Sequence, residues 1–206
     1  MSQTVIMSQI YKELSPAKTK SAVEKLNKIS SGDDLNPNHV KIMAQDLSFT
    51  NGWQRLMAED YSSTPYKQKI FLKNNNKYFT VKYSPTPFQD NHIRDMDLDL
   101  TEGTVIAYMM FYYDYYINGA DRLKPIFHYD DIDWQDDLPP MTRKSIETDF
   151  ANYPTIANEK NGHTIKMPCV FRQTIMIVTF FVSRDGMIEI KDRQSLIDDL
   201  PIKNFS

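Results

Sequence analysis

Residues 103–117 read GTVIAYMMFYYDYYI and are the segment from which the fold is predicted. Apolar and aromatic side chains occupy nearly every position from Val105 to Ile117, and Asp114 is the one charged residue among them. They would cover almost the whole circumference of a helix. A helix that is apolar all round is stable in a protein interior, normally beneath a sheet. We therefore predict a buried central helix here.

Residues on either side set the expected limits of this helix. Asp99 can cap its start, and Glu102 three residues later completes a capping-box pattern. Asn118-Gly119 supplies the left-handed conformation that often ends a helix. The predicted helix therefore covers residues 101–118 and is followed by the acidic loop of residues 128–137.

The C-terminal part shows the clearest strand signals. Thr164–Phe171 and Thr174–Val182 are rich in β-branched and aromatic residues, and Arg184-Asp185-Gly186 is typical of a turn leading into Met187–Ile190. The nine residues of Thr174–Val182 carry no charge. That pattern favours a central strand covered on both faces. Between the central helix and these strands, Pro139-Pro140 predicts a helix that buries Ile146 and Phe150.

Upstream of the central helix, helix-start signals precede a hairpin pattern. Ser15-Pro16 and Asn36-Pro37 each predict a helix, the second carrying Val40, Met43, Ala44 and Leu47, and a shorter helix is expected after Asn51-Gly52. Tyr66–Tyr83 alternates like a β-hairpin. We expect a helical region at residues 1–62 and an α+β domain at 63–206, together forming one compact unit.

This order of elements predicts the fold class. It indicates an α+β protein in which N-terminal helices are followed by a mostly antiparallel sheet packed on a buried central helix. The longest uncharged runs, 103–113 and 173–183, hold 11 residues each, too few to span a membrane. No leader is evident, so we expect a cytoplasmic protein. The oligomeric state is not fixed by the sequence.

Catalytic and cofactor motifs are missing from the sequence. It contains no phosphate-binding loop, nucleophile elbow, His-Glu-x-x-His pair or Cys-x-x-Cys pair. We therefore expect no cofactor, and the sequence identifies no catalytic residues. Cys169 is the single cysteine, and its place in a predicted strand indicates a buried, inert thiol.

The acidic loop of residues 128–137 offers the densest group of potential ligands. His128, Asp130, Asp131 and Asp133 supply imidazole and carboxylate donors at close spacing, which a divalent cation would require. No glycine lies between Gly119 and Gly162 to form a tight ligand-wrapping turn. The alternative interpretation is that these aspartates are solvated turn residues near the start of the next helix.

A second hypothesis is a small-ligand-binding protein or an enzyme whose aromatic and carboxylate pocket lies between the 101–118 helix and the C-terminal sheet. Asp114, Tyr112, Tyr116 and His128 would supply its polar groups, because tyrosine combines apolar area with a polar tip. Asp114 could instead lie on a solvent-facing strip or pair with Arg172. The tyrosines could equally be core residues.

The charge distribution leads to the principal hypothesis. Residues 1–88 carry 12 Lys/Arg and 7 Asp/Glu, a net charge of +5, whereas residues 90–149 carry 5 and 14, a net charge of −9. Such asymmetry favours a protein-binding or regulatory module without catalytic activity. Nucleic-acid binding is disfavoured, because arginine is scarce in the basic part and the pI is near 5.8. The expected contact residues are Asp130, Asp131, Asp133, Lys67, Lys69 and Lys73.

Overall fold

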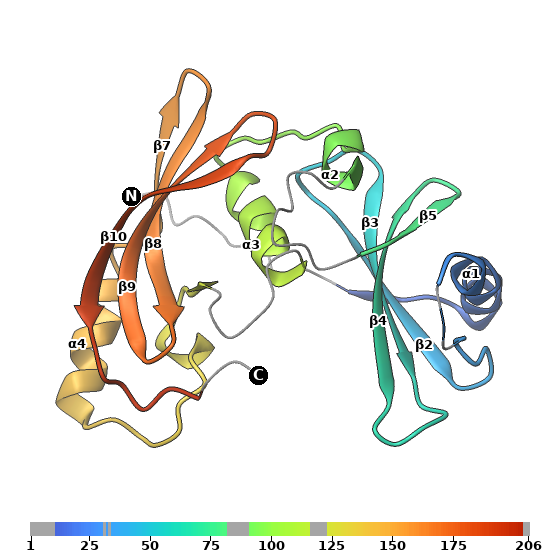
Figure 1. The fold of residues 1–206 in the computed structure, drawn as a ribbon, viewed down its shortest axis with the longest axis horizontal. Coiled ribbons are helices and arrows are strands. Elements are labelled where there is room, and N and C mark those ends of the chain that lie inside the picture. Colours follow the sequence, from blue (N-terminus) through green and yellow to red (C-terminus); the bar gives the residue numbers. More distant parts are fainter. Residues whose placement is uncertain (1–10, 31, 33, 82–90, 116–122, 204–206) are drawn as a thin grey trace. The chain divides into compact units, whose positions relative to one another are not determined.

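The computed structural model describes residues 11–30, 32, 34–81, 91–115 and 123–203 (Figure 1). Contacts between residues divide the chain into two compact units. The N-terminal unit comprises Met1–Lys82 and Asp95–Asp97, and the C-terminal unit comprises Tyr83–Arg94 and Leu98–Ser206. Both contain an antiparallel sheet and at least one helix, which confirms the α+β class.

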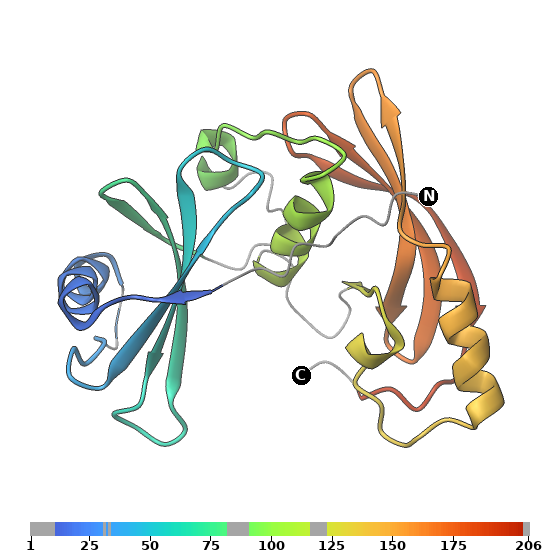
Figure 2. The same ribbon diagram turned by 180° about the vertical axis from the view of Figure 1, so that it is seen from behind.

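The N-terminal unit is a five-stranded meander with one helix beside it (Figures 1 and 2). The strands lie in the order β1-β2-β3-β4-β5, and each neighbouring pair is antiparallel. The elements are β1 (Lys12–Glu13), α1 (Pro16–Ile29), β2 (Val40–Asp46), β3 (Trp53–Asp60), β4 (Lys67–Asn74) and β5 (Lys77–Thr80).

The core of this unit lies between α1 and one face of the sheet. Ala22, Val23 and Leu26 of α1 are buried in a cluster with alternate residues of the strands. The members contributed by the strands are Val40, Ile42, Ala44, Leu56, Ala58 and Phe71. Because strand side chains alternate between faces, this spacing presents one apolar side of the sheet to the helix.

The second and third helices predicted from the sequence are wrong, because those segments are β2 and β3. Val40, Ile42 and Ala44 are buried at a period of two, the period of a strand. The helix-like spacing of Val40, Met43 and Ala44 was coincidental, and pairing with neighbouring strands decides the conformation. Gly52 has φ +75° in the turn before β3, a conformation that glycine readily adopts.

The predicted hairpin is confirmed as β4 and β5 within residues 67–80, and Tyr83 lies outside the described residues. Strand β4 pairs along its whole length with β3, from Asp60↔Lys67 to Trp53↔Asn74. The expected division at residue 62 therefore falls between two paired strands of one sheet.

The second sheet has the order β10-β9-β8-β6, and β7 pairs with β8 beside β6. All of its strand pairs are antiparallel. The remaining elements are α2 (Asn91–Asp95), α3 (Val105–Tyr115), β6 (Lys124–Pro125), the 3-10 helix η2 (Tyr129–Asp131), α4 (Pro140–Phe150), β7 (Thr155–Glu159), β8 (Gly162–Phe171), β9 (Thr174–Ser183) and β10 (Ile188–Ile197).

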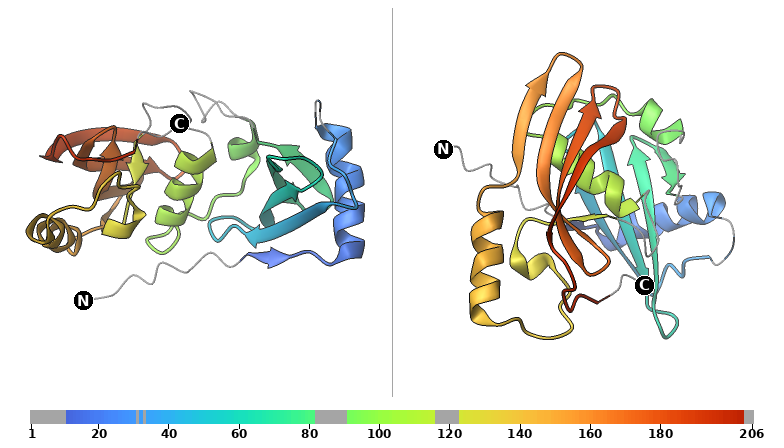
Figure 3. Two further views of the ribbon diagram at one scale, coloured as in Figure 1. Left: turned by 90° about the horizontal axis from the view of Figure 1, so that it is seen from below. Right: turned by 60° about the vertical axis from the view of Figure 1, so that its left-hand side comes forward.

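Strand β9 is central, as its uncharged sequence predicts. It lies between β8 and β10, and helices lie on both sides of it (Figure 3). The ring of Phe180 lies 5.6 Å from that of Tyr113 on α3. Ile175 belongs to the same buried cluster as Ile146 and Phe150 of α4. Residues 175 and 180 point to opposite sides of the sheet, so α3 and α4 contact opposite faces.

Helix α3 begins later than the capping-box pattern predicts. The backbone N–H groups of Thr104 and Val105 donate to the Thr101 carbonyl, and the Thr104 hydroxyl donates to the Asp99 carbonyl. The expected end at Asn118-Gly119 lies outside the described residues. Most of its described side chains are buried, although Asp114 is exposed. The central position expected for this helix stays a prediction. No helix in the described ranges combines the length and apolarity needed to cross a membrane.

Candidate functional site

The loop that begins the acidic segment is held in shape by Asp131. Its Oδ2 atom accepts hydrogen bonds from the backbone N–H groups of Phe127 and His128, each at 2.8 Å. Lys124 Nζ donates to the Asp131 carbonyl at 2.8 Å. Asp131 therefore stabilises the turn that contains η2, and its carboxylate faces its own backbone.

Tyr129 attaches this loop to α4. Its buried ring stacks on Trp134 at a centroid distance of 4.8 Å, and the indole N–H of Trp134 donates to the Tyr129 carbonyl at 3.2 Å. The guanidinium of Arg143 lies 4.5 Å from the centroid of the same ring. Burial raises the pKa of the Tyr129 hydroxyl, and the positive charge of Arg143 opposes this shift. These contacts fix the loop against one side of the helix.

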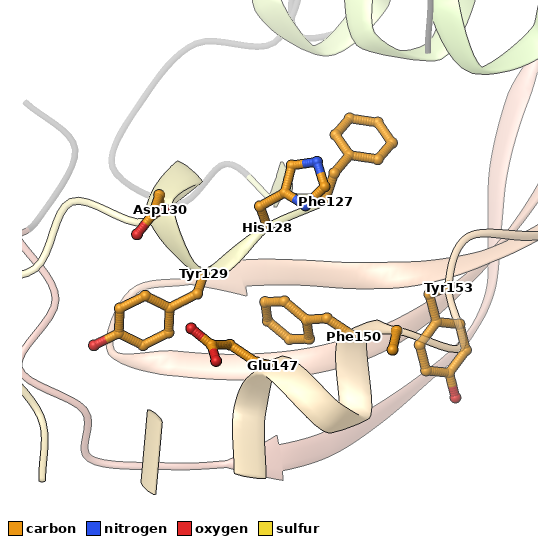
Figure 4. A pocket seen from close by; sticks show the side chains of 8 residues that line it. Phe127, His128, Tyr129, Asp130, Glu147, Phe150 and Tyr153 are labelled. Carbon is orange, nitrogen blue, oxygen red and sulfur yellow. The ribbon is translucent and has the colours of Figure 1, made fainter. Parts of the chain in front are cut away.

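A pocket of about 490 Å³ lies between this loop and the C-terminal half of α4. Figure 4 shows Tyr129, Phe150 and Tyr153 in a row, with Phe127 and His128 above them. The pocket thus combines aromatic walls with two carboxylates. Its lining residues are Phe127, His128, Tyr129, Asp130, Glu147, Phe150, Ala151 and Tyr153.

Arg143 bridges the two carboxylates of the pocket. Its Nη2 atom lies 3.5 Å from Asp130 Oδ1, and its Nε atom donates to Glu147 Oε1 at 2.8 Å. The side chains of Asp130, Arg143 and Glu147 are 83%, 49% and 45% exposed, respectively. Ion pairs exposed to this degree contribute little to stability, about 0–1 kcal/mol. The bridge can therefore open without unfolding the surrounding structure.

The predicted residues of the acidic loop fall into separate roles. His128 and Asp130 line the pocket, whereas Asp131 stabilises the loop. Asp133 Oδ2 lies 3.7 Å from Lys124 Nζ. Across the ranges that the structure describes, no three His, Cys, Asp or Glu side chains are grouped so that they could hold a metal ion. The loop geometry thus offers no support for the divalent-cation hypothesis.

Among the described residues, Tyr112 and Asp114 of the predicted pocket are not part of the lining of this one. Tyr112 is buried on α3, where its ring lies 5.9 Å from that of Tyr113, and burial raises the pKa of its hydroxyl. Asp114 is exposed, and Tyr116 lies outside the described residues. A pocket between the 101–118 helix and the sheet stays a prediction. Cys169 is fully buried, and burial raises the pKa of its thiol.

The three predicted contact lysines make contacts within the N-terminal unit. Lys69 Nζ donates to Ser30 Oγ at 3.0 Å and to the Gly32 carbonyl at 3.3 Å, beyond the end of α1. Lys73 Nζ donates to Gln54 Oε1 at 3.0 Å. The charge of Lys67 helps to lower the pKa of the Asp60 carboxyl. Each lysine thus has a structural contact.

Three pocket residues lie outside the acidic loop, and no sequence pattern connects them with it: Glu147, Phe150 and Tyr153. Glu147 and Phe150 are three residues apart on α4, a spacing that places two side chains on neighbouring positions of a helix surface. This spacing is the sequence feature that places Glu147 and Phe150 side by side on the helix. The sequence could not show that this part of α4 lies against the loop, because that contact is tertiary.

Comparison of the chain with protein-family models, with curated protein sequences and with solved structures found no match in any of the three.

Proposed function

We propose that this protein is a binding or regulatory module without catalytic activity, and that its pocket takes a lysine or arginine side chain of a partner protein. The observation that carries the proposal is the pairing of Asp130 and Glu147 with the rings of Phe150 and Tyr153 in one pocket. We place this activity in the cytoplasm. In this proposal the 101–118 helix is the buried central helix, and it would support the C-terminal sheet beside the pocket.

The chemistry of the pocket suits a long cationic side chain. Lysine and arginine carry an apolar stem that packs on aromatic rings and a charged head that stays near water or a carboxylate. Arg143 demonstrates this fit, because its guanidinium lies over the Tyr129 ring and also contacts Asp130 and Glu147. A partner cation would share these acids with Arg143 or displace it from them.

The charge of the surrounding segment supports a basic partner. Residues 90–149 carry a net charge of −9, and Asp130, Asp133, Asp136 and Asp137 are exposed. A concentration of one sign of charge accelerates association with a surface of the opposite sign. Binding should therefore weaken as the salt concentration rises.

Binding is favoured over acid–base catalysis by the exposure of the two carboxylates. A catalytic acid is usually prepared by burial or by a close like charge. Asp130 and Glu147 are both exposed, and each contacts a cation. Exposed carboxylates that already contact Arg143 can exchange it for a cationic side chain of a partner.

The proposal can be tested with short peptides that carry a central lysine or arginine between apolar residues. Amide chemical shifts of residues 127–130 and 147–153 should move on titration, and matched peptides with norleucine at the centre should bind more weakly.

Replacing Asp130→Lys together with Glu147→Lys should weaken binding about tenfold or more, since two favourable charge contacts become repulsive. Arg143→Gln should strengthen binding, because an internal competitor is removed.

Asp192→Lys is the matched control, because it reverses the charge of an exposed residue on β10, outside the pocket lining. It should leave binding unchanged. Equal affinity for the lysine and norleucine peptides would refute a cation-binding pocket, as would equal losses in the pocket and control variants.

A further inference from the structure

Tyr129 presents one face of its ring to a planar cation. Trp134 stacks on this ring at a centroid distance of 4.8 Å and an interplanar angle of 24°. The guanidinium carbon of Arg143 lies 4.5 Å from the centroid of the same ring. Because one face has room for a single group at this distance, the indole covers one side of the ring and the guanidinium covers the other. The indole N–H also donates to the Tyr129 carbonyl, which holds the two rings together.

Two carboxylates contact the same guanidinium and come from different elements. Asp130 of η2 lies 3.5 Å from Nη2 of Arg143, and Glu147 of α4 accepts a hydrogen bond from Nε at 2.8 Å. A guanidinium can make both contacts while it covers a ring, because it is flat and its five N–H groups point outward in one plane. An ammonium group has three donors on a single nitrogen and no flat face. We call Tyr129, Asp130 and Glu147 together the guanidinium site.

We propose that the pocket selects an arginine side chain of the partner protein over a lysine side chain, and that Arg143 occupies the guanidinium site until the arginine of the partner displaces it. Selectivity of this kind rests on the proposed function, in which either cation would be accepted. The group that the site holds is itself an arginine, and its contacts depend on the shape of the guanidinium as well as on its charge. The same group on a partner can make the same contacts.

The pocket beside the guanidinium site has room for the rest of an arginine side chain. Its volume is about 490 Å³, and Phe127, Phe150 and Tyr153 supply aromatic lining. The rings of Phe150 and Tyr153 continue the row that begins with Tyr129 (Figure 4). The methylene stem of an arginine can pack along these rings while its head contacts the carboxylates. A guanidinium is also more weakly hydrated than an ammonium group, so it loses less hydration when it stacks on a ring.

Arg143 can leave the guanidinium site without disturbing α4. Its side chain is 49% exposed, and ion pairs with this exposure hold their partners weakly. The backbone N–H of Arg143 donates to the Pro139 carbonyl at 3.0 Å, and this bond does not involve the side chain. The first turn of the helix therefore persists when the guanidinium moves away.

Three matched peptides test the selectivity, with arginine, lysine or citrulline at the centre between apolar residues. Citrulline has nearly the shape of arginine but no charge. In titrations of the intact chain, followed by the amide shifts of residues 127–130 and 147–153, the arginine peptide should bind about tenfold more tightly than the lysine peptide. The citrulline peptide should bind more weakly than either.

The outcomes separate this proposal from the proposed function. Equal affinity for the arginine and lysine peptides would overturn the selectivity and leave a cation-binding pocket in place. Equal affinity for the arginine and citrulline peptides, or no binding of either cationic peptide, would refute the proposed function and the selectivity together.

Arg143→Lys and Arg143→Ala separate the shape of the internal cation from its charge. A lysine at this position keeps the charge but cannot contact both carboxylates from the face of the ring, so it should compete almost as weakly as alanine. Both variants should therefore bind the arginine peptide about threefold or more tightly than the wild-type protein. Unchanged amide shifts outside residues 127–153 would show that both variants are folded.

Arg184→Lys is the matched control, because Arg184 is exposed in the turn after β9 and is not part of the pocket lining. It should leave the affinity for the arginine peptide unchanged. If Arg143→Lys binds this peptide no more tightly than the wild-type protein does, charge alone governs the site and the proposal is overturned.

Discussion

At the residue scale, Asp60 is the clearest case of a buried charge that is needed for structure. It is 1% exposed and accepts hydrogen bonds from the backbone N–H groups of Asn36, at 2.7 Å, and Ser62, at 2.9 Å. Burial alone would raise its pKa. The bonds from Asn36 and Ser62, with the charge of Lys67, outweigh this effect and lower the pKa below its ordinary value of 3.8.

Replacing Asp60→Asn should lower the free energy of unfolding of the N-terminal unit by about 2 kcal/mol, because charge-assisted bonds to two backbone groups are lost. A carboxyl with a lowered pKa stabilises the fold above its ordinary pKa, and this contribution disappears as the pH falls through the folded value. The variant should therefore lose less stability than the wild-type protein when both are acidified below about pH 4.

Urea unfolding at pH 7 and at low pH measures both effects. Asp46→Asn is the control, because Asp46 is exposed on the same sheet, and it should change stability by no more than about 0.5 kcal/mol. Equal effects of the two substitutions would show that Asp60 has no special role.

At the scale of single elements, the turn between β9 and β10 depends on a glycine. Gly186 has φ +89°, and a Cβ atom there would lie 2.6 Å from both Leu98 Cδ1 and the Tyr108 hydroxyl. Gly32 has a similar φ of +82° but nothing within 4 Å of that position. Alanine at either site should lower the free energy of unfolding by about 1 kcal/mol through backbone strain. Gly186→Ala should lower it by about 1–3 kcal/mol more, because the added methyl group overlaps its neighbours. Thermal unfolding would compare the two, and equal losses would contradict this account.

Helix α4 contributes its stability through one buried face. Ile146 is fully buried among residues of the C-terminal sheet, so Ile146→Ala should cost about 3 kcal/mol through lost burial and an unfilled cavity. Met141 lies on the same helix and is 82% exposed. Met141→Ala should change stability by no more than about 0.5 kcal/mol. Comparable effects in urea unfolding would mean that α4 does not pack as described.

At the scale of the whole molecule, the two units should unfold in separate transitions. The chain has 2 tryptophans, and each unit contains one: Trp53 is stacked on Phe79 and Trp134 on Tyr129. With Trp134→Phe, fluorescence reports the N-terminal unit, and with Trp53→Phe it reports the C-terminal unit. Asp60→Asn should shift the Trp53 transition alone, and Ile146→Ala the Trp134 transition alone. One transition shared by both probes would show that the units unfold together.

Several elements could be predicted because their signals are local. Pro16 and Pro140 start helices as expected, and the uncharged run in β9 identified a central strand. The segments β2 and β3 were predicted wrongly because their apolar residues fit two periods at once. Pairing with β1 and β4 favours the strand conformation over the helix, and a local sequence pattern contains no information about this pairing.

The α+β class, the acidic loop and the apolar character of residues 105–113 follow from the sequence alone, because composition and periodicity are properties of the chain. The pairing of the strands and the identity of the helix residues that contact the loop are set by tertiary packing. Asp130 and Glu147 are 17 positions apart and share a pocket through contacts between η2 and α4. Contacts of this kind depend on packing between distant segments, and no local pattern of residues specifies them.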